Sequence, residues 1–223
     1  MEFEFEIRLM KKIIFFILWT LTILLVPVTI LKVTPLNIAL SEQKLLINFL
    51  QRFVGLLAFT LLFWQIILGA FMEKWIEKLG GWIFKFHVTE GAIAYALVIL
   101  HPLLFILFNF KAFGKLDPFY VFTDICLLCP NKLELFYTLG RISFWLVTVA
   151  VIVAKFRTWG WLRIYWRKFH ILNYIGFLLA ALHGGMVGTD LRLHFPLPLL
   201  YSVAVSVVAI ILFYKFYILV LKK

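Results

Sequence analysis

Long apolar runs separated by short polar segments dominate the chain. Six runs approach or exceed the roughly 20 residues that a helix needs to cross a bilayer, and charged residues, proline or glycine bound each of them. They lie at 12–31, 47–70, 83–109, 136–154, 169–188 and 197–219. The pattern predicts an all-α integral membrane protein with a six-helix transmembrane bundle at 12–219, an N-terminal tail at 1–11 and a C-terminal tail at 220–223.

The third and fifth runs each contain two histidines. The third lies within KFHVTEGAIAYALVILHP, with His87 and His101 fourteen positions apart, and the fifth within KFHILNYIGFLLAALHG, with His170 and His183 thirteen positions apart. An ionisable side chain at the centre of a bilayer costs about 2.5 to 3.5 kcal/mol on insertion scales, so such residues persist mainly where they bind or conduct something. The four histidines are therefore candidate ligands.

Helix geometry arranges these histidines in two pairs. Fourteen residues return to within about 40° of the same face and rise about 21 Å, so His87 and His101 share a face at opposite depths. Thirteen residues leave His170 and His183 about 140° apart on an ideal helix. We therefore expect His170 at a frayed first turn, or a tightened or bulged turn near Gly176. If both helices run in one direction, His87 is level with His170, and His101 with His183.

Two separated histidine pairs favour haem over zinc. A zinc site needs ligands converging on one point, usually with cysteine or carboxylate among them, whereas paired neutral imidazoles suit haem iron. The small residues Gly91, Ala94 and Val98 would let a flat macrocycle approach the third helix. Phe177, seven residues after His170, either lies between two macrocycles or takes part in ordinary apolar packing.

With these motifs the chain resembles the ferric reductase-like transmembrane domain, the six-helix di-haem core of NADPH oxidases and ferric-chelate reductases. The resemblance rests on His-x13-His in the third span, His-x12-His in the fifth and the lead-in WLRIYWRKFH, and it covers nearly the whole chain. It implies two b-type haems, with His87 and His170 as iron ligands of the inner haem and His101 and His183 of the outer one. The chain is also similar to the stand-alone haem membrane subunit of the bacterial methionine sulfoxide reductase system.

Charge distribution predicts the orientation in the membrane. The N-terminal segment, the loops after the second and fourth spans and the C-terminus carry most of the lysines and arginines, so both termini should be cytoplasmic in a bacterial or archaeal plasma membrane. No small-x-small cleavage site follows the first run, which we expect to be a retained helix rather than a cleaved signal peptide. The net charge of +11 reflects this bias and anionic lipid rather than nucleic acid.

Further polar residues are expected near the outer surface or the haems. Arg52 and Arg141 would pair with propionates of the outer haem, or snorkel to the headgroups; in the NADPH oxidase branch an arginine at the place of Arg52 lies beside the outer haem. Cys126 and Cys129, in CLLC, should form a disulfide, structural or redox-active. Glu90 would hydrogen-bond in the headgroup region or near the inner haem, and His194 would be a solvated or interfacial residue.

The function that follows is transmembrane electron transfer, in the membrane haem subunit of an oxidoreductase. The chain contains no glycine-rich phosphate loop, so the donor should be separate: a cytoplasmic flavin reductase carrying FAD or FMN, or a membrane quinol. The acceptor outside would be a ferric chelate, oxygen or a partner protein. One alternative is a transporter or channel that uses the buried histidines for protons or metal ions, which requires a polar path between them. Another is a purely structural membrane subunit.

Overall fold

Residues 2–193 and 195–221 are described by a computed structural model of the chain. Every regular element among them is a helix, and six segments are long and apolar enough to cross a membrane. The predicted all-α, six-helix bundle is therefore confirmed. The spans are formed by α1 (Glu2–Val33), α3 (Gln43–Ala70), α5 (Trp82–Phe113), α7 (Lys132–Lys155), α8 (Leu162–His170) with α9 (Leu172–Val187), and α11 (Leu197–Leu221).

The ends of the chain differ in detail from the predicted tails. Helix α1 begins at Glu2, so residues 2–11 of the predicted N-terminal tail are helical. Its residues include glutamate, lysine, leucine and methionine, which favour helices. At the other end α11 continues to Leu221. His194, expected to be solvated or interfacial, lies outside the described residues.

Four short helices occupy the connections between the spans. They are α2 (Leu36–Ala39), α4 (Met72–Leu79), α6 (Tyr120–Thr123) and α10 (Asp190–Leu193). Helix α4 ends at Gly80, whose φ of 96° is accessible to glycine and strained for other residues. The amphipathic sequence of α4 contrasts with the apolar spans beside it, as expected of a helix outside the apolar layer.

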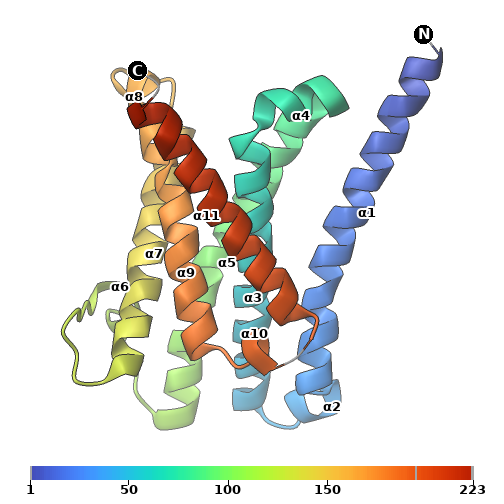
Figure 1. Ribbon diagram of the computed structural model, residues 1–223. Helices are drawn as coiled ribbons and strands as arrows, with labels where there is room; N and C mark the ends of the chain where they lie inside the picture. Colours follow the sequence, from blue (N-terminus) through green and yellow to red (C-terminus); the bar gives the residue numbers. More distant parts are fainter. Residues whose placement is uncertain (1, 194, 222–223) are drawn as a thin grey trace.

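The spans alternate in direction (Figure 1). The start of α1, the end of α11, α4 and α8 lie on one side, here the terminal face, and α2, α6 and α10 lie on the other, here the loop face. Helices α5 and α9 both run from the terminal face to the loop face. This parallel direction is what the predicted pairing of the histidines requires.

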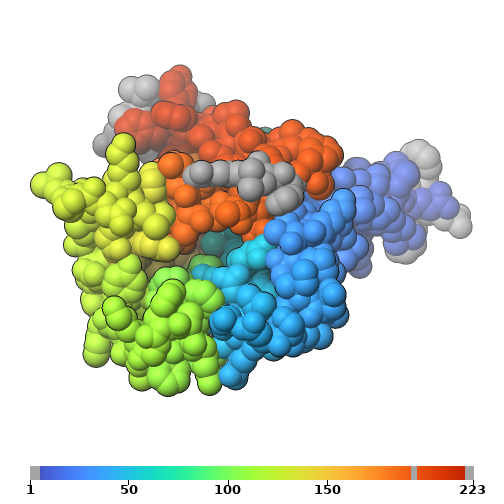
Figure 2. Space-filling model, turned by 90° about the horizontal axis from the view of Figure 1, so that it is seen from below, coloured from blue at the N-terminus to red at the C-terminus, as the bar shows by residue number. Residues whose placement is uncertain are grey.

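Two helix pairs form the centre of the bundle. Helix α3 packs mainly along α5, and α7 mainly along α9. A core of buried side chains that includes Ile66, Phe177 and Val208 joins α3, α9 and α11. Seen from the loop face, the molecule is hollowed between the two pairs (Figure 2). Large apolar side chains on α1, α5 and α11, such as Ile14, Ile93 and Ile210, are exposed, as expected for lipid-facing surfaces.

The fifth span is interrupted directly after its first histidine. Helix α8 ends at His170, and α9 begins at Leu172 after a one-residue turn at Ile171. Ile171 itself keeps helical angles, with φ −62° and ψ −23°, and α9 is helical through Gly176, so the way in which His170 and His183 come to one side stays a prediction.

Candidate functional site

The structure brings together the histidines predicted to form pairs. His87 and His101 lie on the uninterrupted helix α5, His170 ends α8 and His183 lies in α9. The rings of His101 and His183 lie edge-on, with their centroids 6.4 Å apart and their planes at 80°. On the terminal side, His87 lies within electrostatic range of His170. We call these the loop-side pair and the terminal-side pair.

Main-chain carbonyls orient both rings of the loop-side pair. His101 Nδ1 lies 3.0 Å from the carbonyl oxygen of Gln51 on α3, and His183 Nδ1 lies 3.0 Å from that of Phe136 on α7. A carbonyl oxygen only accepts, so each Nδ1 carries the proton and donates. The neutral ring then has its free lone pair on Nε2, the state in which histidine binds a metal.

Two glycines permit these hydrogen bonds. A Cβ atom on Gly55 would lie 2.7 Å from Nδ1 and Cε1 of His101, and one on Gly140 would lie 2.8 Å from Nδ1 of His183. Each glycine stands four residues after the carbonyl that the histidine uses, so it leaves the side of the helix open at the acceptor. The two halves of the loop-side pair are therefore held by the same arrangement.

A third glycine, Gly69 of α3, lies next to a histidine ring of the terminal-side pair. A Cβ on Gly69 would lie 3.4 Å from Cε1 of His87, an ordinary contact distance. Gly55 and Gly69 are fourteen residues apart, as are His87 and His101, and α3 and α5 are antiparallel. These glycines were not predicted as part of the site, although the matching spacing is visible in the sequence.

The loop-side pair borders a cavity of about 490 Å³, within the usual range of ligand pockets. Both rings line it, together with apolar and aromatic side chains such as Phe59, Phe105 and Phe144. Of the small residues expected to face a macrocycle, Val98 lines the cavity. Gly91 instead faces Gln65 of α3, and Ala94 is fully buried.

The candidate ligands at this cavity are two imidazoles. No group of three or more His, Cys, Asp or Glu that could hold a metal ion occurs among the described residues. Two imidazoles on opposite sides of one metal, with each nitrogen at about 2 Å, have ring centroids about 6 Å apart. The ring centroids of His101 and His183 are 6.4 Å apart, close to this separation. The pair therefore fits a group that supplies its own equatorial ligands.

In the described part of the chain, only His170 of the terminal-side pair has a main-chain hydrogen-bond partner, Ala150 of α7. His87 Nδ1 is buried without a hydrogen-bond partner among the described residues. His170 Nδ1 lies 3.3 Å from Nδ2 of Asn173, whose Oδ1 is buried and unpartnered in the same part of the chain. Turning this amide by 180° would place Oδ1 next to Nδ1 and give His170 the tautomer found at the loop-side pair.

Glu90 lies in a buried hydrogen-bond cluster beside the terminal-side pair. Its carboxylate accepts from Trp19 Nε1 at 2.9 Å and from Gln65 Nε2 at 2.5 Å. The same Gln65 nitrogen donates to the main-chain oxygen of His87 at 2.9 Å. Glu90 thus links α1 and α3 to α5 one turn from His87.

Arg52 lines the cavity but already has a protein anion. Its Nε donates to Asp190 at 2.8 Å, its Nη2 pairs with the second oxygen of that carboxylate, and its Nη1 donates to Thr34 at 2.9 Å. Asp190 is buried. This fork-to-carboxylate pair provides a counterion for Arg52 within the protein, and pairing with a propionate stays a prediction.

Arg141 also lines the cavity and is also paired. It is buried, donates to Glu134 at 2.6 Å and to the carbonyl oxygen of Asp124, and lies over the Tyr120 ring with 4.3 Å to the centroid. Tyr120 in turn donates to Glu134 at 2.7 Å. Burial, followed by this carboxylate, raises the pKa of Tyr120. The acidic partners of the two arginines, Asp190 and Glu134, were not predicted from the sequence.

Phe177 is fully buried and packs against α3. Its ring stacks on Phe59, with centroids 4.6 Å apart and planes at 21°, and lies 6.4 Å from Phe63. Phe59 lines the cavity, so Phe177 supports the wall from behind. The structure shows the packing role, and a place between two cofactors stays a prediction.

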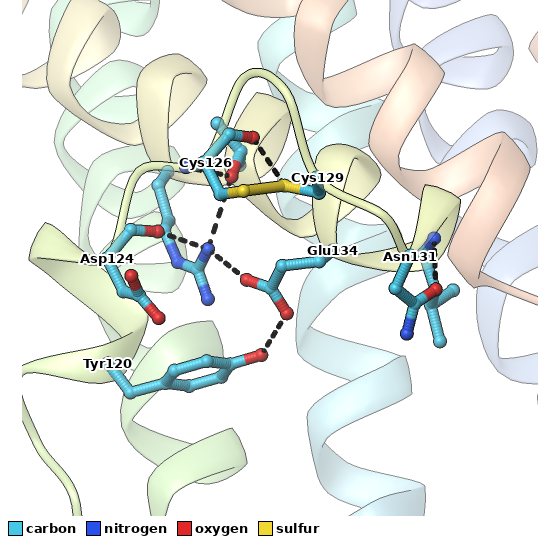
Figure 3. Close-up of a disulfide and its surroundings, with 9 residues drawn as sticks. Tyr120, Asp124, Cys126, Cys129, Asn131 and Glu134 are labelled. Carbon is cyan, nitrogen blue, oxygen red and sulfur yellow. Dashed lines mark hydrogen bonds and ion pairs between the residues drawn. A yellow bond between two sulfur atoms is a disulfide. The ribbon is translucent and has the colours of Figure 1, made fainter.

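Cys126 and Cys129 form a disulfide in the segment between α6 and α7 (Figure 3). The segment is fastened to α7 by Cys126 N, which donates to Thr138 Oγ1 at 3.0 Å, and by Arg141, which donates to Asp124. Tyr120 and Val121 from the same segment line the cavity, so the disulfide loop belongs to its wall on the loop face.

In comparisons with known proteins, no family model, no curated protein and no solved structure matches the chain.

Proposed function

We propose that the chain is a b-type haem protein that carries electrons across a membrane. The observation that supports this proposal most is the loop-side pair: two imidazoles from different helices, with ring centroids 6.4 Å apart, beside a cavity of about 490 Å³. His101 and His183 would be the axial ligands of the outer haem, and His87 and His170 those of the inner haem. Bound haem supplies one-electron oxidation and reduction of its iron.

The protein's own groups orient the ligands and shield them. The carbonyls of Gln51 and Phe136 hold the Nδ1 protons of the loop-side pair, which fixes the ring orientation and makes Nε2 more basic. Aromatic and aliphatic side chains make up much of the cavity wall and would limit the contact of a bound group with water. Arg52 and Arg141, each held by a carboxylate, place cationic groups at its wall, where they would favour added negative charge.

The direction of transfer follows from the proposed orientation. With the basic terminal face in the cytoplasm of a bacterial or archaeal cell, electrons would enter near His87 and His170 and leave near His101 and His183. The donor would be a flavin reductase carrying FAD or FMN, or a membrane quinol. The acceptor would be a ferric chelate, oxygen or a partner protein on the loop face.

An absorption spectrum of the purified protein tests the proposal. We expect b-type haem bands that change on reduction, with about two haems per chain because there are two histidine pairs. His101→Ala should remove about half of the haem and leave the terminal-side pair loaded. Leu100→Ala, a change at a neighbouring exposed position of α5, is the matched control and should keep both haems. A protein purified with added haem that shows no bands contradicts the proposal, and favours a transporter or structural subunit.

A further inference from the structure

The Cys126–Cys129 disulfide contributes little that the fold requires. It joins residues three apart, and the stabilisation from a disulfide grows with the length of chain that it closes. Three other bonds already fasten this segment to α7, from Cys126 N to Thr138, from Arg141 to Asp124 and from Tyr120 to Glu134. A purely structural role therefore leaves the bridge largely unexplained.

The surroundings of the disulfide suit contact with another protein. Both cysteines are only partly buried. Large aliphatic side chains stand next to them: Ile125 is 52% exposed, Leu127 62% and Leu128 97%. Exposed apolar side chains gathered at one place mark interaction sites, and here the two leucines lie between the reactive sulfurs in sequence.

We propose that Cys126 and Cys129 form a thiol–disulfide exchange site for a soluble protein that carries a reactive dithiol. The Cys-x-x-Cys spacing is the one used by disulfide oxidoreductases. The apolar side chains of Ile125, Leu127 and Leu128, here the leucine patch, would contact the partner around its cysteines. The proposal does not depend on bound haem.

The exchange takes place in two steps, and atoms and electrons balance in each of them. A thiolate of the partner attacks one sulfur, the Cys126–Cys129 bond breaks, a mixed disulfide forms, and the released cysteine takes up a proton. The partner's second thiolate then attacks its own sulfur in the mixed disulfide and releases the other cysteine, which also takes up a proton. The partner is oxidised to a disulfide, and Cys126 and Cys129 are reduced to thiols. Cys129 Sγ lies 2.9 Å from the carbonyl oxygen of Cys126, an acceptor for the new thiol.

The site adjoins the loop-side pair through one stretch of α7. Phe136 accepts the hydrogen bond from His183, and Thr138, about 3 Å further along the helix axis, accepts the one from Cys126 N. The same helix turn therefore positions a histidine of the cavity on one side and the exchange site on the other.

A glutathione titration tests the redox activity of the full-length protein in detergent. The protein is equilibrated with buffers of reduced and oxidised glutathione, and its thiols are counted by gel shift after maleimide–polyethylene glycol labelling. We expect half-reduction within the range of these buffers, because exchange-active disulfides are more oxidising than structural ones. A bridge that stays oxidised in the most reducing glutathione buffer, and opens only with dithiothreitol, overturns the proposal.

A trapping experiment tests the leucine patch. Thioredoxin that lacks its resolving cysteine is the probe, and the product is a mixed disulfide seen by gel shift. We expect the adduct with the unaltered chain and a several-fold lower yield with Leu128→Ser. Leu116→Ser, also at an exposed leucine (66%) of the segment after α5, is the matched control and should leave the yield unchanged. No adduct, or equal yields for the two variants, overturns the proposal.

Discussion

Glycines determine how closely His101 and His183 can approach the neighbouring helices. Because a Cβ on Gly55 would lie 2.7 Å from two ring atoms of His101, the imidazole must move and lose its hydrogen bond to Gln51. We expect Gly55→Ala to remove most of the loop-side haem while the terminal-side haem remains, measured by haem content and by reduced-minus-oxidised spectra.

Gly81→Ala is the control for this prediction. Nothing lies within 4 Å of a Cβ placed there, and its φ of −65° is accessible to alanine. Its haem content should match the unaltered protein and its stability should change by less than about 0.5 kcal/mol. Equal haem loss in the two variants would contradict the specific role of Gly55.

The residues proposed to bind haem were visible in the sequence, but the hydrogen-bond partners of the polar residues were not. Histidines in apolar runs stand out because placing an ionisable side chain in a bilayer costs free energy. Their spacing predicted which of them form pairs. The carboxylate partner of Arg52 lies 138 positions away at Asp190, and no local pattern connects the two. Their pairing depends on the packing of α10 beside α3, which only the three-dimensional structure shows.

At the scale of elements, the Arg52–Asp190 pair fastens α10 to α3 and, through Thr34, to the end of α1. Asp190→Asn would leave Arg52 without its anion. We expect the free energy of unfolding to fall by about 1 to 3 kcal/mol, less than for a fully buried pair because Arg52 keeps some solvent contact. The measurement is thermal melting in detergent.

Glu42→Gln provides the matched control for that pair. It removes one carboxylate from the ion pair with Lys44, in which both side chains are about half exposed, so its effect should be below about 0.5 kcal/mol. If Asp190→Asn melts at the same temperature as the control, the pair does not stabilise the loop face.

The long elements were predictable and the short ones were not. Six apolar runs gave six spans, the fifth of which consists of α8 and α9 with Ile171 between them. Helices of four residues, such as α6 and α10, are too short to show a periodic pattern of apolar residues. Their positions depend on contacts with neighbouring spans.

At the scale of the whole molecule, two helix pairs enclose the cavity. Helix α3 packs along α5, and α7 packs along α9. Each histidine pair consists of one ring from α5 and one ring from the span formed by α8 and α9. A haem bound by both rings would join the halves where the protein itself leaves a cavity of about 490 Å³. The cofactor would then be part of what holds the bundle closed.

Haem removal should therefore lower the stability of the whole bundle. A ligand that binds only the folded state stabilises it by about 4 kcal/mol at a thousand times its dissociation constant, so protein produced without haem should melt at a lower temperature than loaded protein in the same detergent. Adding haem should restore the melting temperature in the unaltered protein and only in part in His101→Ala, which retains the terminal-side pair. Equal melting temperatures with and without haem would show that the two helix pairs associate without help from the cofactor.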